Sequence, residues 1–296
     1  MSENNNHLAP PVPLIDTHVH LWDLDKFQLP WLAGAEVQPI CRSFLLPDYL
    51  AQTQGLDVAQ AVYLEVNVHP AQQIQEAEYV LELCRRDDNP LTAAILGGSP
   101  QSENFAGMAQ RYAGNPHVRG FRTVLHDADR PRGMCLEPLF VKHIQLLGQL
   151  GLRFELCMRP AELLDGVRLV EQCPGTQFIL DHCGCLGAQA TDASLRKQWT
   201  SAMRAMAQQE NVALKISGIV ASANKNWQPQ DLVPNIEFCL DTFGDRRVCF
   251  GGDWPVCTLR GSFHQWVEAL RWIIRDRPPP FARQLFHDNA IQIYAL

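Results

Sequence analysis

The chain has 296 residues, of which 46% are hydrophobic and 19% are charged, so it can bury a large core in one or two domains. The formal net charge is -7 and no basic run is visible, which argues against nucleic acid as a partner. No stretch approaches the roughly 18 apolar residues of a membrane span, and the polar, proline-rich start lacks the pattern of a secretory signal. The ten cysteines are scattered without zinc-finger spacing, so we expect reduced thiols in a cytoplasmic protein. We expect a small molecule as its partner and no membrane contact, and oligomeric state is not predicted.

Short apolar runs rich in β-branched residues recur along the chain and alternate with amphipathic stretches. The predicted strands lie at residues 13–21, 61–68, 92–98, 118–124, 152–158, 177–184, 212–218 and 247–254. Predicted helices include 71–86 and 136–151, and the second ends in a glycine suited to a helix C-terminal cap. Alternating strands and helices indicate a parallel sheet, and eight such units favour a (β/α)8 TIM barrel. We expect one α/β barrel domain over residues 1–296, with residues 1–12 as a flexible arm.

An open doubly wound sheet is the alternative fold. That fold usually has a glycine-rich phosphate loop after its first strand. Here the first strand continues into HLWDLDKFQLPWL, which has no such loop. The barrel is therefore favoured.

The alternation of side chains along each strand predicts which residues face the barrel interior. The outer face packs against helices and should be apolar. On this rule Ile15, Thr17 and Val19 face outward in the first strand, as do Val62, Leu64 and Val66 in the second. The residues predicted to face inward are Asp16, His18, His20, Tyr63, Glu65, Asn67, Arg153, Glu155, Cys157, Lys215, Ser217 and Asp253. Arg122 and His182 lie near strand ends, where alternation is less regular.

A barrel interior with this many polar groups is hard to explain by packing, because unpaired buried charge costs several kcal/mol per group. Barrel enzymes place their chemistry at the carboxyl ends of the strands, which accounts for such a set. A structural explanation stays open for three of these residues, since Glu65 could be a paired core residue and Lys215 could form an ion pair with Glu155. The sequence therefore predicts an active site at the barrel mouth.

Four motifs resemble one protein family. DTHVHLWD in the first strand, LDHCG in the sixth, LKISG in the seventh and FGGDWP in the eighth are similar to the amidohydrolase superfamily. More narrowly they resemble its lactonase branch, the amidohydrolase-2 proteins related to sugar-acid lactonases and 2-pyrone-4,6-dicarboxylate lactonase. The resemblance implies a (β/α)8 barrel that hydrolyses a cyclic ester. It places His18 and His20 on the first-strand pair, His182 on the sixth-strand histidine and Asp253 on the eighth-strand aspartate, and it assigns Arg122, in RGFR, to the substrate.

The resemblance implies at most one metal ion in the site. Metal-dependent relatives usually carry a histidine or a carboxylated lysine at the end of strand four or five, and VRGFRTV and LRFELCM contain neither. This departure argues against a binuclear site. We expect either no required cofactor or a single Zn²⁺ on His18, His20 and Asp253, with Glu65 as a further ligand.

Hydrolysis of a lactone needs an activated water, stabilisation of the oxyanion and a proton for the leaving alkoxide. We predict Asp253 as the general base and His18, His20 and His182 as hydrogen-bond donors to the carbonyl. Substrate-binding roles are predicted for Arg122, through its guanidinium fork, and for Lys215, Trp22 and Trp254, the tryptophans as a floor for a sugar ring.

The expected substrate is a sugar-derived lactone such as one from L-rhamnose or L-fucose. Three alternatives stay open. They are a metal-dependent decarboxylase of the same superfamily, an amide hydrolase, and a non-enzymatic barrel that binds a sugar acid.

Overall fold

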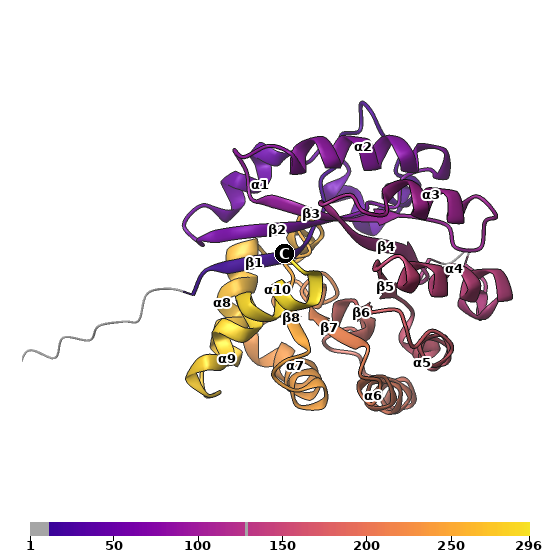
Figure 1. The fold of residues 1–296 in the computed structure, drawn as a ribbon. Helices are drawn as coiled ribbons and strands as arrows, with labels where there is room; N and C mark the ends of the chain where they lie inside the picture. The colour runs from indigo at the N-terminus through magenta and orange to yellow at the C-terminus, as the bar shows by residue number, and fades with distance from the viewer. Residues whose placement is uncertain (1–11, 128–129) are drawn as a thin grey trace, which may run out of the picture.

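The computed structural model describes residues 12–127 and 130–296, and its eight strands form one parallel sheet in the order β1 to β8 (Figure 1). The predicted arm at residues 1–12 lies outside the described residues except for Val12. The strands are β1 (Leu14–Val19), β2 (Val58–Leu64), β3 (Leu91–Gly97), β4 (Val118–Val124), β5 (Arg153–Cys157), β6 (Phe178–Leu180), β7 (Val212–Ile216) and β8 (Val248–Phe250). The predicted strands and barrel are confirmed.

Helices cover the outside of the strands, as Figure 1 shows. They are α1 (Leu46–Thr53), α2 (Gln73–Cys84), α3 (Phe105–Tyr112), α4 (Pro138–Gln149), α5 (Leu163–Gln172), α6 (Ala193–Ala207), α7 (Pro229–Phe243), α8 (Phe263–Ile273), α9 (Pro279–Arg283) and α10 (Asn289–Tyr294). Both helices predicted at residues 71–86 and 136–151 are present, and Gly151 follows α4 with a φ of +71°. Among the described residues, no helix is long and apolar enough to cross a membrane.

The barrel closes where its first and last strands meet at their carboxyl ends. The backbone N–H of Asp253 donates to the carbonyl of His18 at 2.8 Å, and that of His20 donates to the carbonyl of Trp254 at 2.8 Å. Closure therefore brings the first-strand histidines directly beside the aspartate that follows β8.

A bulge in β1 changes the direction of its side chains. Asp16 pairs with Ala61 and Val19 pairs with Tyr63, so β1 has one more residue than β2 over this interval. Thr17 contacts the interior residue Cys249, and His18 also reaches interior groups. The inward prediction for His18 and His20 is thus correct, whereas three neighbours were predicted wrongly: Ile15 and Thr17 face inward, and Asp16 accepts a hydrogen bond from Tyr49 of α1.

Within β2 the side-chain directions were also predicted the wrong way round, although Glu65, just beyond its end, pairs with the interior residue Arg122 as an inward residue should. Val62 and Leu64 belong to the interior apolar cluster, while the hydroxyl of Tyr63 donates to Glu76 of α2 at 2.9 Å. The error has a physical reason, because the half of the interior near the amino ends of the strands is itself apolar. An apolar residue in a strand therefore does not reveal which face it occupies.

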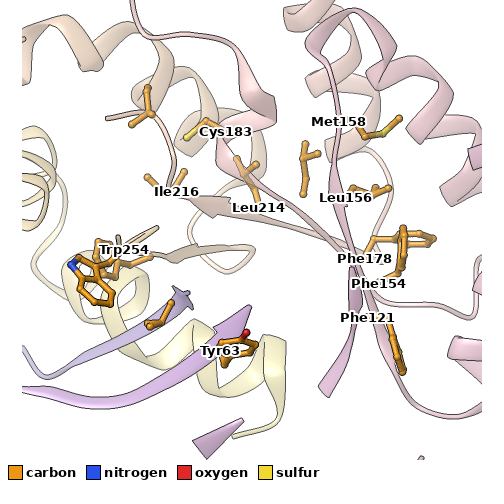
Figure 2. Packing of buried hydrophobic residues seen from close by; sticks show 14 of the residues in the cluster. Tyr63, Phe121, Phe154, Leu156, Met158, Phe178, Cys183, Leu214, Ile216 and Trp254 are labelled. Carbon is orange, nitrogen blue, oxygen red and sulfur yellow. The ribbon is translucent and has the colours of Figure 1, made fainter. Parts of the chain in front are cut away.

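The interior cluster is closed at one end by the C-terminal helix. Ala290, Ile293 and Tyr294 of α10 pack with Ile15 of β1 and Ile179 of β6, and α10 lies over the strands in Figure 1. The larger cluster packs strands against helices, and Figure 2 shows Tyr63, Phe121, Phe154 and Trp254 among its members. The opposite end of the barrel is left for polar groups.

Candidate active site

A cavity of about 440 Å³ opens at the carboxyl ends of the strands. Its lining brings together His20 just after β1, Arg122 of β4, Cys157 of β5, His182 after β6 and Asp253 after β8. Four of the predicted site residues therefore lie around one space. The volume is in the range of small-molecule sites.

Unusual backbone conformations surround this cavity. Asn67, His182, Cys185 and Asp253 all line it and have φ values between +51° and +59°. Left-handed conformations are uncommon for residues other than glycine, and they tend to cluster at functional sites. Each of these residues lies just after a strand, where the turn directs its side chain across the barrel mouth.

Asp253 lies beside the two first-strand histidines. One carboxylate oxygen is 3.5 Å from Nε2 of His20 and 3.7 Å from Nε2 of His18. The Asp253 residue is only 3% exposed, but it lines the cavity, whereas His18 is fully buried and does not. His18 is therefore one layer below the space where a substrate would bind.

His182 is held by the residues that follow β7. Its Nδ1 lies 3.0 Å from the hydroxyl of Ser217, and its ring packs against Gly218. Burial works against a charged imidazole, but Asp253, Cys157 and Asp181 outweigh it and raise the pKa of His182 to about 9. His182 therefore carries a positive charge at neutral pH, next to Asp253.

Arg122 is already held by the protein. Its Nε donates to the Glu65 carboxylate at 2.6 Å, and its Nη2 donates to the Glu65 carbonyl at 2.8 Å. Nη1 lies 3.3 Å from both Asp181 and Nε2 of His18. The predicted two-pronged grip on a substrate does not fit, because most of the guanidinium donors are in use. The cation can still act on the cavity that it lines.

Lys215 lies beneath the histidines in a buried ionic network. Its ammonium is 2.7 Å from Glu155, 3.3 Å from Asp181 and 3.1 Å from Nδ1 of His18. Lys215 is fully buried and does not line the cavity, so the structure does not support substrate binding by this residue. The ion pair with Glu155 that the sequence left open is present.

The protonation states in this network follow from burial and pairing. Burial opposes the ammonium of Lys215, yet Asp181 and Glu155 raise its pKa. Burial and the Asp181 charge raise the pKa of Glu155, whereas Lys215, 2.7 Å away, lowers it and holds the pair. Burial, Lys215 and the neighbouring rings hold the pKa of His18 well below its usual value. His18 is thus a neutral imidazole beside a cation.

The spacing of His18, His20 and Asp253 resembles that of metal ligands. The two Nε2 atoms are 3.1 Å apart and lie 3.7 and 3.5 Å from the carboxylate oxygen. Ligands of a tetrahedral Zn²⁺ at 2.0–2.1 Å lie about 3.3 Å apart. By distance alone, these atoms are consistent with a divalent metal.

The hydrogen bonds and charges do not fit a resident cation at these three residues. Nδ1 of His20 donates to the Leu64 carbonyl at 3.0 Å, so Nε2 is the nitrogen of this ring that could face a cation. Nδ1 of His18 instead accepts from the ammonium of Lys215, so the proton of this neutral ring lies on Nε2. The Arg122 guanidinium, 3.3 Å from the same Nε2, adds a second cation. Glu65, the expected fourth ligand, is paired with Arg122. We therefore assign no step to a metal here.

Neither predicted tryptophan lines the cavity. Trp22 and Trp254 are buried, and each packs against Phe44 in the core (Figure 2 shows Trp254). The indole N–H of Trp22 donates to the carbonyl of Arg42. Trp31 lines the cavity instead, with its indole N–H bonded to the Val66 carbonyl at 2.8 Å.

Several lining residues were not predicted as site residues. They are Trp31, Asn67, His126, Asp127, Cys157, Arg159 and Cys185. Most of them belong to loops without a recognisable motif. The sequence indicated only Cys157 and Asn67, which were predicted to face the barrel interior. Cys157 has unusual surroundings, because a hydrogen bond from Cys185 and the adjacent His126 hold the pKa of its thiol well below the usual range despite burial.

The profile of the amidohydrolase family matches residues 15–296. The chain belongs to the amidohydrolase family. An L-fucono-1,5-lactonase from Burkholderia multivorans is 28% identical over 292 residues, which cover 95% of this chain and 96% of that protein. The family assignment confirms the resemblance that the four motifs indicated, and it agrees with a hydrolase.

Solved structures show the same fold. An amidohydrolase from Burkholderia multivorans with bound zinc superposes with a TM-score of 0.84 at 23% identity, covering 96% of this chain and 99% of that one. A putative 2-pyrone-4,6-dicarboxylic acid hydrolase from Pseudomonas putida gives a TM-score of 0.73 at 19% identity, covering 96% and 98%. These similarities confirm the barrel.

Proposed function

We propose that this protein is a lactonase that opens a sugar-derived aldonolactone with a water activated by Asp253. The observation that carries the proposal is the juxtaposition of the Asp253 carboxylate with the positively charged His182 at one cavity. The 28% identical L-fucono-1,5-lactonase supports cyclic-ester chemistry.

Asp253 has the position that a general base needs. It follows β8 at the barrel mouth, and its backbone N–H and carbonyl are both fixed, by His18 and Cys257 respectively. A water in the cavity can lose a proton to this carboxylate while its oxygen bonds to the lactone carbonyl carbon. The proton then passes from Asp253 to the ring oxygen as the C–O ester bond breaks, which yields the open hydroxy acid.

His182 supplies the charge that this reaction requires. The carbonyl oxygen becomes negative when water adds, and a fixed positive group stabilises it best where water is excluded. Of the three predicted histidines, His18 is buried beneath the cavity, and both ring nitrogens of His20 already face protein groups, Nδ1 the Leu64 carbonyl and Nε2 the His18 ring. His182 is therefore the histidine that we propose faces the carbonyl, with the Arg122 cation nearby.

The polar groups around the cavity favour a hydroxyl-rich substrate. Asn67, Asp127, Arg159 and Ser222 line it together with the reacting groups. Asn67 donates to Asp127 at 2.8 Å and Arg159 donates to Glu162 at 2.7 Å. A substrate without hydroxyl groups would leave their remaining hydrogen-bonding sites desolvated and unpaired, at about 1–3 kcal/mol each. The free thiols of all ten cysteines agree with a reducing, cytoplasmic location, which we also propose.

The test of the base is Asp253→Asn with Asp276→Asn as its control, since the Asp276 side chain is 84% exposed and far from the cavity lining. We expect Asp253→Asn to fold normally and to lower kcat for an aldonolactone by about 10²- to 10⁴-fold, and Asp276→Asn to retain full activity. Near-normal turnover by a well-folded Asp253→Asn would remove this residue from the base role.

The test of the substrate is a panel read by proton release. It compares kcat/KM for L-fucono- and L-rhamnono-lactones with plain γ- and δ-lactones of equal ring size, an aromatic dicarboxylate lactone and an amide. Sites built to bond a hydroxyl discriminate strongly against analogues that lack it. Equal values for sugar and plain lactones would contradict the sugar-acid substrate, and binding without turnover of any compound would contradict an enzyme.

A further inference from the structure

A second group of metal-binding side chains lies at the barrel mouth, apart from His18 and Asp253. His126 is two residues beyond β4, Cys157 is the last residue of β5, and Cys185 ends the 3-10 turn after β6. Their ligand atoms all lie within 4.8 Å of one another, and Nδ1 of His126 is 3.1 Å from the sulfur of Cys157. Two loops and the end of β5 thus converge on one point.

The chemistry and spacing of this group suit Zn²⁺. Thiolate and imidazole are its preferred ligands, and bonds of about 2.3 and 2.0–2.1 Å place the donors about 3.5–3.8 Å apart. The His126–Cys157 distance of 3.1 Å is slightly shorter than that range, and no two ligand atoms are more than 4.8 Å apart. All three side chains line the cavity, so a fourth coordination position would face it. Three protein ligands with one open position is the arrangement of exchangeable zinc sites.

The surroundings of His126 differ from those of His18 in the way that matters for a metal. Nε2 of His126 lies 3.8 Å from the Asp127 carboxylate, while its Nδ1 faces the thiols. Metal-bound histidines usually direct their other nitrogen toward a carboxylate or carbonyl, which orients the ring and increases its basicity. Nδ1 of His18 also has a carboxylate neighbour, Asp181 at 3.6 Å, but the Lys215 ammonium lies closer to it, at 3.1 Å.

The backbone also holds the thiols in place. His182, Cys183 and Cys185 all have positive φ, at 55°, 52° and 59°, which turns the segment after β6 back toward β5. Cys157 is buried and Cys185 is half-buried. The carbonyl of His126 accepts a hydrogen bond from Arg159 at 3.3 Å, which fixes the loop after β4.

We propose that His126, Cys157 and Cys185 form a binding site for a thiophilic divalent cation of the Zn²⁺ class, separate from the His18, His20 and Asp253 group. A cation there would occupy part of the cavity that we assign to the lactone. The site therefore provides a means for zinc to inhibit substrate binding. The inference does not depend on the proposed function, because the coordination can be measured without turnover.

The experiment is titration of the reduced, metal-free full chain with Co²⁺ and Zn²⁺. We expect one equivalent of Co²⁺ to produce thiolate-to-cobalt charge-transfer absorption, and Zn²⁺ to displace it. Cys157→Ser and Cys185→Ser should lose this absorption and weaken Zn²⁺ binding at least about tenfold. Two control variants should leave the cobalt absorption and the Zn²⁺ affinity unchanged. They are Cys41→Ser, which alters an exposed cysteine, and Asp253→Asn.

His126→Ala provides a second variant if a cysteine substitution prevents folding, because the His126 side chain is 45% exposed. His126→Ala should weaken Zn²⁺ binding. The thiolate-to-cobalt absorption from Cys157 and Cys185 should remain but shift in wavelength. Three results would overturn the proposal: no charge-transfer absorption with the intact chain, zinc binding abolished by Asp253→Asn but not by Cys157→Ser, or a Cys157–Cys185 disulfide in the protein as purified.

Discussion

Replacing Gly218 with alanine should displace His182 while leaving every ionisable group of the site in the chain. A Cβ at this position would lie 2.3 Å from Nδ1 and 2.5 Å from Cγ of His182. Ordinary contact begins at 3.4 Å, so the imidazole must move by about 3.4 - 2.3 = 1.1 Å. That movement would break the bond of His182 to the Ser217 hydroxyl, now 3.0 Å long.

The expected magnitude follows from this displacement. A 1 Å misplacement of a reacting group can cost about 10²-fold in rate, so we expect kcat/KM to fall by about that factor. The φ of +66° at Gly218 also disfavours alanine, which should lower the free energy of unfolding by about 1–2 kcal/mol. The variant should therefore remain folded at room temperature while losing most of its activity.

The assay is lactone hydrolysis by proton release, paired with urea unfolding of the same preparations. Gly187→Ala is the matched control, since it follows the cavity residue Leu186 and its added Cβ would meet nothing closer than 4.0 Å. We expect that control to behave as the unaltered protein. Full kcat/KM in a stably folded Gly218→Ala would show that the position of His182 does not matter for the reaction.

Three further predictions concern pH, metal and stability. The pKa of His182 is raised from 6.5 to about 9, so its contribution to folding stability is full below about 6.5 and is lost as pH rises through 9. The charge of the folded protein's His182 is itself lost near pH 9, where kcat/KM, corrected for spontaneous hydrolysis, should fall. A fall at the same pH in His182→Gln would contradict the assignment. Chelator-treated, metal-free protein should retain most of its lactonase activity, since Lys215 and Arg122 flank His18, and loss of activity that Zn²⁺ restores through His18, His20 and Asp253 would refute this. Lys215→Met should lower the free energy of unfolding by about 3–5 kcal/mol, because Glu155 and Asp181 lose their buried partner. The control Lys197→Met, at an exposed position, should change the free energy of unfolding by less than about 0.5 kcal/mol. Equal effects of the two substitutions would contradict a stabilising role for the buried ionic network.

The architecture could be predicted from the sequence, because the hydrophobic pattern of each strand or helix depends only on residues that are near one another in the chain. Each β-branched run and each amphipathic stretch identified its own element, and eight alternating pairs sufficed for the barrel. Inward directions were correctly predicted for His18 of β1 and for His20 just after it, and also for Glu155 in β5 and Lys215 in β7. These positions are the carboxyl ends of strands or their interior face, and parallel strands bring such ends together wherever the chain folds into a barrel.

The predicted side-chain directions were wrong where the local sequence pattern carries no information about the face of the strand. The one-residue bulge between Asp16 and Val19 depends on pairing with β2, and the faces of Val62 and Tyr63 depend on an interior that is partly apolar.

By itself, then, the sequence determined the barrel, the family motifs and a polar site at one end. Only the tertiary structure decided which of those polar groups reach the cavity. Folding buried Trp22, Trp254 and Lys215, and it paired the Arg122 guanidinium with Glu65. It also brought His126, Cys157 and Cys185 together from two loops and the end of β5. The reason is physical: strand periodicity fixes the face on which a side chain lies, whereas its depth and partners depend on segments that are distant in the chain.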